Sequence, residues 1–198
     1  MNAPAPFPDP RELAARIADA ALLRGEFTLR SGRTSRYYLD KYRFSTRPEI
    51  LAPLGTLLAE RARAIESDVG AHLDRLAGAE LGGIPLVTAA SLTTGLPALF
   101  VRNTRKDYGT AQRLEGLYEA GDRVVFIEDV ATTAGQALEA AGVLREAGLI
   151  VLAVLSVIDR QEGARENVEA AGLRFEALFT KADLDIDDGA RPDGSRDA

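Results

Sequence analysis

From Leu73 onward the chain alternates short apolar segments with helical patterns, and this alternation constrains the fold more than any other feature. The clearest apolar segments are 124–128 and 150–158, and helical patterns follow them near Gln136 and Glu162. Strands that alternate with helices of about 10–15 residues are typical of a parallel sheet with helices on both faces. We therefore predict an α/β fold whose ligands bind beyond the carboxyl ends of the strands.

The remaining elements are predicted from the same patterns. Asp9 is a typical helix N-cap with Pro10 at the first helical position, and we expect this helix to end at Gly25. Two short strands and a second helix would form a small N-terminal hood before the main sheet. We expect one domain over 1–198, with a loose arm at 1–8 and a disordered tail at 187–198. The other predicted segments are strands 27–29, 37–39, 74–77, 98–101 and 174–179, helices 48–63, 84–95, 136–147 and 162–171, and loops 102–116 and 130–135.

Composition excludes several classes of protein. The net charge of −6 over 198 residues argues against a general nucleic-acid binder, which carries a basic excess. The absence of cysteine excludes thiolate nucleophiles and cysteine-ligated metals, and a single histidine, His72, disfavours a Ser–His–Asp triad. We expect His72 to be an ordinary surface or core residue. The N-terminus does not resemble a signal peptide and no apolar run is long enough for a membrane span, so we expect a cytoplasmic protein without membrane contacts.

The most informative segment is 124–135, where a buried strand ends in Glu128 and Asp129. Small and hydroxylic residues from Val130 to Gly135 follow, and then a helix begins. Backbone N–H groups at such a helix start bind a phosphate, and the two carboxylates suit neighbouring sugar hydroxyls. One loop would thus recognise a sugar phosphate. The alternative is that the acids only end the strand, with Asp129 capping the next helix.

The strand, the acid pair and the Thr-Thr-x-Gly sequence resemble the phosphoribosyl pyrophosphate (PRPP) motif of the type I phosphoribosyltransferase family. The resemblance covers about 27–184 and is closest to the orotate phosphoribosyltransferases. The segments 31–33 and 159–160 favour orotate in particular. The other segments that support the resemblance are 27–30, 82–86 and 101–109.

The resemblance implies a reaction and its participants. The 5-phosphoribosyl group of PRPP would be transferred to orotate, giving orotidine 5′-monophosphate and pyrophosphate in de novo pyrimidine synthesis. Mg²⁺ would be the cofactor, carried by substrate oxygens and water with no direct protein ligand. The protein would be a homodimer in which each active-site loop is supplied by the partner subunit.

The segment 102–113 holds four cations and one aspartate in an otherwise acidic chain. A basic loop can neutralise a polyanionic leaving group, and the resemblance implies that Arg102 and Lys106 bind pyrophosphate. Asn103 stands where many relatives carry a second lysine, and Tyr108 stands where some carry histidine. The alternative is a solvated run of charges. The residues to which the resemblance assigns catalysis are Lys106, Arg102 and Asp129.

A second basic cluster, Arg30, Arg33 and Arg36, precedes two tyrosines, Tyr37 and Tyr38, for which strand packing is the alternative to a ligand role. Gly82 and Gly83 permit close approach of the backbone to pyrophosphate, and the alternative is that they only form a turn from loop to helix. Some relatives carry a lysine in this loop, and this chain does not. The resemblance assigns orotate binding to Tyr38, Thr132 and Arg160, the last of which would otherwise be a surface charge. It assigns PRPP binding to Arg30, Arg102, Lys106, Tyr108, Glu128, Asp129, Val130, Ala131, Thr132, Thr133, Ala134, Gly135 and Gln136.

Two rival functions remain open at this point. One is a phosphoribosyltransferase for another base, which Arg160 and the segment 31–33 disfavour. The other is a non-catalytic nucleotide-sensing regulator with the same fold, which could lose the loop cations or an acid and still bind its ligand. In this chain both are present.

Overall fold

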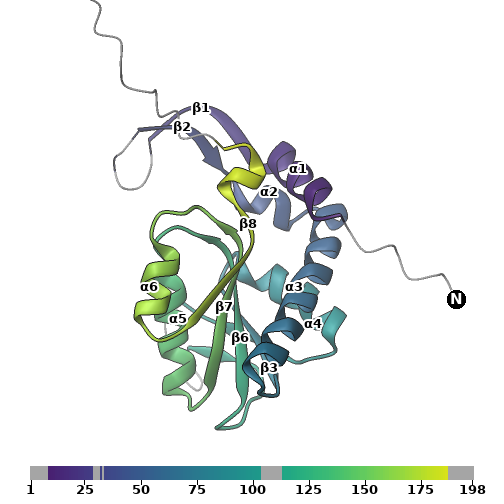
Figure 1. Cartoon of the computed structure of the whole chain (residues 1–198), viewed down its shortest axis with the longest axis vertical. Coiled ribbons are helices and arrows are strands. Elements are labelled where there is room, and N and C mark those ends of the chain that lie inside the picture. The colour runs from purple at the N-terminus through teal and green to yellow at the C-terminus, as the bar shows by residue number, and fades with distance from the viewer. Residues whose placement is uncertain (1–8, 29–31, 33, 104–112, 187–198) are drawn as a thin grey trace, which may run out of the picture.

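The computed structural model describes residues 9–28, 32, 34–103 and 113–186. The predicted arm at 1–8 and tail at 187–198 therefore lie outside the described residues. The predicted α/β fold class is confirmed: a mostly parallel sheet lies between two layers of helices, and a small hood covers one end (Figure 1).

The main sheet has six strands in the order β5-β4-β3-β6-β7-β8. All neighbouring strands run parallel except the edge strand β5, which is antiparallel to β4. The central strand β6 is apolar on both faces, since Val125 and Ile127 enter one core and Val124 and Phe126 enter the other. The strands are β3 (Arg75–Ala79), β4 (Ala98–Val101), β5 (Leu114–Glu115), β6 (Arg123–Ala131), β7 (Ile150–Asp159) and β8 (Arg174–Thr180).

Helices cover both faces of this sheet, so each face has its own core. Buried side chains of α3 and α4, such as Leu58 and Val87, pack on one face. Buried side chains of α5 and α6, such as Ala141 and Val168, pack on the other. The helices are α3 (Pro48–Val69), α4 (Gly83–Thr94), α5 (Gly135–Glu146) and α6 (Ala164–Ala170).

The hood combines α1, α2 and a two-stranded antiparallel sheet, and it lies at the carboxyl end of the main sheet (Figure 1). The side chain of Asp9 caps α1 by accepting the N–H of Arg11, as predicted. A short 3₁₀ turn, η1, follows β8 and packs against α1. The elements are α1 (Pro10–Ala21), β1 (Leu22–Thr28), β2 (Thr34–Leu39), α2 (Lys41–Ser45) and η1 (Lys181–Leu184).

Several predicted boundaries in the N-terminal half are wrong. The first helix ends at Ala21 rather than Gly25, because Leu22 is extended and pairs with Leu39 in the hood sheet. The second long helix runs past Arg63 and ends where Gly70 adopts a left-handed conformation with φ of 65°. The short helix α2 was not predicted.

Three predictions in the C-terminal half also need correction. The predicted loop 102–116 contains the edge strand β5, which pairs with the end of β4. The predicted loop 130–135 begins later than Val130, since Val130 and Ala131 still pair with β7. Helix α6 begins at Ala164 instead of Glu162, because Gly163 takes a left-handed conformation before it.

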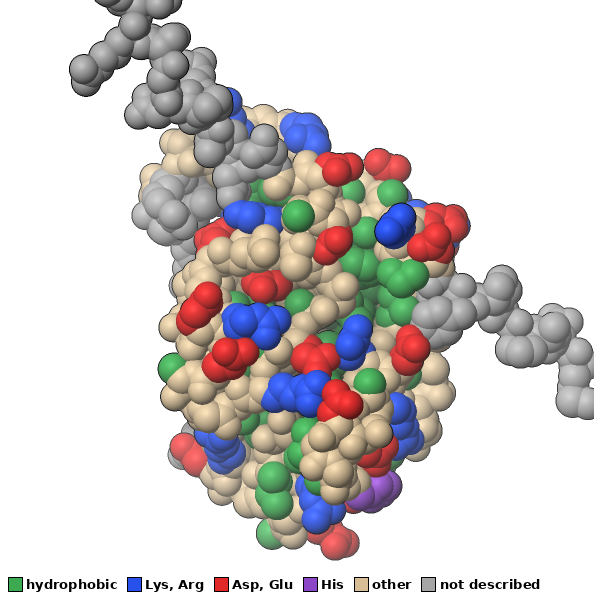
Figure 2. All heavy atoms as spheres, in the orientation of Figure 1, with side chains coloured by type: hydrophobic (Ala, Val, Ile, Leu, Met, Phe, Trp, Pro, Cys, Tyr) green, Lys and Arg blue, Asp and Glu red, His purple; other side chains and the backbone are tan. Residues whose placement is uncertain are grey.

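Acidic and basic side chains are interspersed on the part of the molecule that is coloured in Figure 2. Within the described ranges, no helix is both long and apolar enough to cross a membrane.

Candidate active site

The carboxyl ends of four parallel strands bring the predicted site residues to one edge of the sheet. Because β3 pairs with both β4 and β6, and β6 pairs with β7, the segments that follow these strands are neighbours. Arg102 follows β4, Asp129 is the second residue of the acid pair in β6, and Arg160 follows β7. The edge predicted from the strand pattern is thus the edge where the candidate residues meet.

A pocket of about 300 Å³ lies at the N-terminus of α5. Ala134 caps this helix without a side-chain hydrogen bond, so the first N–H groups of α5 have no side-chain acceptor at the cap. Ala134 also has a φ of 59°, a strained conformation for a residue with a Cβ, and it turns the chain sharply into the helix. These features are those of a phosphate-binding loop. The pocket is lined by Glu128, Val130, Ala131, Thr132, Thr133, Ala134, Gly135, Gln136, Ala137 and Glu139.

The acid pair of β6 divides between the two faces of the sheet, since consecutive strand side chains point in opposite directions. Glu128 lies on the face of Phe126 and lines the phosphate pocket. Asp129 lies on the face of Ile127 and approaches the start of α4. The two carboxylates therefore reach a ligand from different sides of the same strand end.

Both acids are buried, with exposed fractions of 9% for Glu128 and 1% for Asp129. Burial, and after it the neighbouring Asp129 carboxylate, raises the pKa of Glu128 to about 8, although Lys41 opposes the shift. Glu128 is therefore largely protonated at neutral pH, and it can donate as well as accept a hydrogen bond. Strand ends that only terminate secondary structure do not need two buried acids.

The Asp129 carboxylate is held by three segments. Its Oδ1 accepts the N–H of Val130 at 2.6 Å, and its Oδ2 lies 2.8 Å from Nζ of Lys41 on α2. A Cβ added at Gly82 would lie only 1.6 Å from Oδ2, so glycine is required there. Gly83 also packs tightly, against the carbonyl of Ile127. The close approach predicted for the two glycines is thus directed at β6.

Arg160 connects the end of β7 with the hood. Its guanidinium donates to the hydroxyl of Tyr37 at 2.9 Å, lies over the ring of Tyr37, and forms an ion pair with Glu162 at 2.8 Å. Its Nε is buried and has no partner. The hydroxyl of Tyr37 therefore lies at the site, whereas Tyr38 is 46% exposed and contacts Phe27 instead.

The end of β4 places Arg102 and Asn103 beside the loop after β3. The N–H of Asn103 donates to the carboxylate of Glu80 at 2.6 Å. Arg102 has a weak ion pair with Glu115 at 3.8 Å, while its Nε is buried without a partner among the described residues. Among the described residues, Nε of Arg102 and Nε of Arg160 are thus both buried hydrogen-bond donors without an acceptor.

The structure brings together most of the described candidates but not all. Arg102, Arg160 and the segment 128–136 meet at the carboxyl edge, whereas Tyr38 is not in contact with Arg160. Three candidates, Arg30, Lys106 and Tyr108, lie outside the described residues, as do Ser31 and Arg33.

Sequence reasoning missed Lys41 as a neighbour of the acid pair, and it left open whether Tyr37 packs in a strand or contacts a ligand. The signal for Lys41 was its position directly after the predicted strand 37–39, with Asp40 as a capping residue. The signal for Tyr37 was strand alternation, which places Tyr37 and Tyr38 on opposite faces. Neither signal identifies the residue of the main sheet that the side chain contacts, which is Asp129 for Lys41 and Arg160 for Tyr37.

The chain was compared with family models and with known proteins. No family model matches. A Pyrococcus abyssi protein named orotate phosphoribosyltransferase is 40% identical over 174 residues, which cover 87% of this chain and 93% of that protein.

The fold agrees with solved structures of orotate phosphoribosyltransferases. Orotate phosphoribosyltransferase of Mycobacterium tuberculosis in complex with Fe(III) dicitrate has a TM-score of 0.79 and 34% identity, covering 90% of this chain and 100% of that one. The same enzyme in complex with PRPP has a TM-score of 0.75 and 33% identity, with 90% and 100% coverage. The chain is therefore a member of the orotate phosphoribosyltransferase family.

Proposed function

We propose that this protein transfers the 5-phosphoribosyl group of PRPP to orotate, forming orotidine 5′-monophosphate and pyrophosphate. The observation that carries the proposal is the combination, at one strand end, of an uncapped helix start and two buried acids. This combination suits a ribose 5-phosphate, because N–H groups bind the phosphate and carboxylates bind the hydroxyls. Family membership supplies the base and the leaving group.

Each part of the edge has a role in this reaction. The segment 130–136 binds the 5-phosphate, Glu128 and Asp129 bind the ribose hydroxyls, and the Asp129 carboxylate stabilises the positive charge that develops on the sugar. Arg160 binds the orotate carboxylate, because a planar guanidinium matches two carboxylate oxygens. Thr132 and Tyr38 complete the proposed orotate site. The ring nitrogen of orotate then attacks C1 as pyrophosphate leaves, and no protein nucleophile is required.

Pyrophosphate needs cations, and the structure offers one in described residues. Arg102 lies at the end of β4 with a buried Nε that lacks a partner. Arg30, Lys106 and Tyr108 are proposed to join it, although they lie outside the described residues. With these groups around it, the leaving pyrophosphate is neutralised as the bond to C1 breaks.

Mg²⁺ is proposed as the cofactor. The described residues contain no cluster of three or more His, Cys, Asp or Glu side chains that could hold a metal ion, and Asp129 is already paired with Lys41. The donor set therefore fits an ion carried by pyrophosphate oxygens and water. Its chemistry would be to neutralise the leaving group.

The proposed homodimer shares its active-site loop, so Lys106 of one subunit would serve the site of the other. Mixing inactive Lys106→Ala and Asp129→Asn proteins tests this, because hybrid dimers would contain one intact site. We expect recovery of up to about a quarter of wild-type activity from random assortment of subunits. A mixture as inactive as its components would place both residues in one subunit's site.

The reaction is tested by following orotate absorbance with PRPP and Mg²⁺, with adenine, hypoxanthine and uracil as alternative bases. We expect loss of the orotate absorbance and no product from the other bases. Consumption of another base in place of orotate would contradict the base assignment. Nucleotide binding without turnover would instead favour a nucleotide-sensing regulator, the second candidate for this fold.

A further inference from the structure

A cation that the sequence patterns did not predict, Lys41, lies against the acid pair of β6. Lys41, the first residue of α2, belongs to the hood, whereas Asp129 ends a strand of the main sheet. The side chain of Asp129 is 2% exposed and that of Lys41 is 33% exposed. Lys41 therefore covers the carboxylate from the hood side while its own ammonium reaches solvent.

The orientation of the Asp129 carboxylate is fixed by contacts on both oxygens. The N–H of Val130 donates to Oδ1, the Lys41 ammonium contacts Oδ2, and Oδ2 occupies the space that a side chain at Gly82 would take. Each carboxylate oxygen can accept more than one hydrogen bond, so these contacts leave acceptor capacity for a ligand. Lys41 thus fixes the acid without using up its acceptors.

A cation is needed here for an electrostatic reason. Glu128 and Asp129 are adjacent carboxyl groups with little access to water, and the Asp129 carboxylate disfavours ionisation of Glu128. A buried carboxylate that loses its partner takes up a proton rather than remaining charged. A protonated acid has fewer acceptors for sugar hydroxyls and does not stabilise a cationic sugar.

We propose that Lys41 is a positioning residue of the sugar site, which acts through Asp129 by keeping its carboxylate charged and oriented for the ribose hydroxyls. The inference rests on the proposed function for the identity of the sugar. It adds a residue of the hood to a site that is otherwise built from the main sheet.

The groups around this pair determine how pH acts on it. Lys41 and Tyr42 face the pair from α2, Glu128 faces it from β6, and the loop before α4 contributes the backbone of Gly82. Burial lowers the pKa of Lys41, but Asp129 more than compensates, and the pKa of Lys41 is raised overall. Lys41 therefore stays charged between about pH 7 and 9, a range in which Glu128 ionises.

The test measures ligand binding to the full chain by calorimetry. Ribose 5-phosphate carries the hydroxyls that Asp129 would bind, whereas inorganic phosphate occupies only the loop at α5. We expect Lys41→Met to weaken ribose 5-phosphate binding at pH 7 by about 10- to 100-fold, because the buried Asp129 carboxylate loses its cationic partner. Phosphate binding should change less than about twofold.

Two further variants separate charge from structure. Lys41→Arg keeps the cation and should restore most of the ribose 5-phosphate affinity. Arg43→Met removes a cation from the same helix without touching Asp129, since Arg43 is half-exposed and lies near Asp40. We expect that control to bind both ligands as the wild type does.

The inference is overturned if Lys41→Met binds ribose 5-phosphate normally, or if it loses both ligands equally. The second result would mean direct attraction of anions or a damaged fold. A wild-type protein that shows this Lys41-dependent sugar binding but does not consume orotate would refute the proposed function and leave this inference intact.

Discussion

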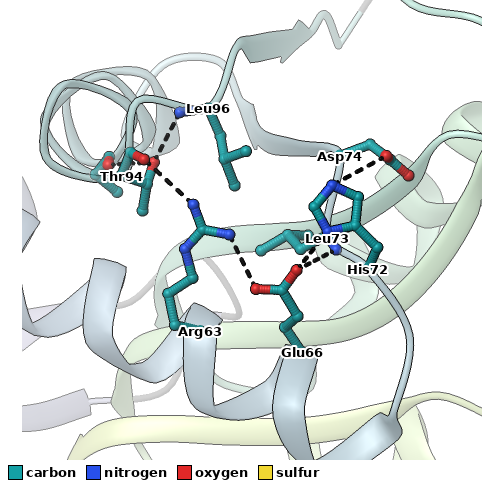
Figure 3. Close-up of polar contacts among 8 residues, drawn as sticks. Arg63, Glu66, His72, Leu73, Asp74, Thr94 and Leu96 are labelled. Carbon is teal, nitrogen blue, oxygen red and sulfur yellow. Dashed lines mark hydrogen bonds and ion pairs between the residues drawn. The ribbon is translucent and has the colours of Figure 1, made fainter.

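The two ends of the main sheet each carry a cluster of charged residues, but the clusters are built differently. At the amino end, Glu66 accepts the N–H of Leu73 at 2.8 Å and contacts both Arg63 and His72 (Figure 3). Arg63 also donates to the carbonyl of Thr94. Three segments, namely α3, the residues before β3 and the end of α4, are thus joined by a network in which each drawn charge has a partner.

At the carboxyl end, charge is buried and donors remain unused. Lys41 pairs with Asp129, and within the described residues the Nε atoms of Arg102 and Arg160 are buried without a partner. Buried polar groups without partners destabilise a protein, so their presence at one edge indicates that a ligand completes the set. The comparison teaches that the amino-end cluster holds the fold, whereas the carboxyl-end cluster is the one that we propose binds the substrate.

The largest difference should come from neutralising one acid in each cluster. Asp129→Asn should lower kcat/KM for PRPP by about 100- to 1000-fold, because it removes charge that stabilises the transition state. Glu66→Gln, the matched variant at the amino end, should leave kcat/KM within about twofold of the wild type. Steady-state kinetics of both proteins decide the point. An Asp129→Asn protein with the kcat/KM of the wild type would contradict the proposed difference between the two clusters.

Next in size is the effect of one methyl group. Gly82→Ala would place its Cβ 1.6 Å from Oδ2 of Asp129 and must displace the carboxylate, so we expect at least about a tenfold loss of kcat/KM. Gly142→Ala is the control, because Gly142 lies within α5 with nothing within 4 Å of an added Cβ. It should leave activity unchanged and stabilise the helix by up to about 1 kcal/mol. Equal kinetics for the two variants would refute the role of the Gly82 contact.

Arg160→Ala should act mainly on orotate. Loss of a charged hydrogen-bonding partner should raise the KM for orotate by about 10- to 100-fold, with a smaller change in the KM for PRPP. Arg165→Ala removes a half-exposed arginine that stacks on Phe175, away from the site, and should leave both KM values unchanged. If the KM for PRPP rises instead, Arg160 belongs to the pyrophosphate site.

The smallest effects are on stability, and they should have opposite pH dependence at the two ends. The raised pKa of Glu128 means that the folded state favours its protonated form, so this residue costs stability as pH rises from about 4.5 to 8. A backbone hydrogen bond from Leu73, with help from Arg63, lowers the pKa of Glu66, so this residue contributes stability above about pH 4.5 that is lost on acidification.

Denaturant unfolding at several pH values tests this difference. Glu128→Gln should be more stable than the wild type at pH 8 by at least about 1 kcal/mol, while Glu66→Gln should be less stable by about 1 kcal/mol. Both differences should diminish near pH 4. Parallel pH profiles for the two variants would contradict the contrast between the clusters.

Local patterns predicted much of the fold and the edge that carries the site. The apolar segment 124–128 identified the central strand because β6 is buried on both faces, and the cap at Asp9 located α1. The segment 128–136 contained both halves of a sugar-phosphate site in consecutive residues. Such features are determined by neighbours in the sequence, and sequence reasoning reaches them.

The rest depends on contacts between distant segments. Lys41 meets Asp129, and Tyr37 meets Arg160, only because the hood lies over the carboxyl end of the sheet. The two residues of β5 are too few to give a periodic pattern, and the short helix α2 has the same limitation. Pairings of this kind require the position of the hood, which no local pattern determines.

The most direct test of the account is hydrogen exchange of the full chain with and without PRPP and Mg²⁺. The account predicts that PRPP slows exchange in 128–137 at the start of α5 and in 37–42 of the hood, while 63–74 at the amino end is unchanged. Protection confined to 63–74, or none at 128–137 under saturating PRPP, would contradict the claim that the carboxyl-end cluster is the substrate site.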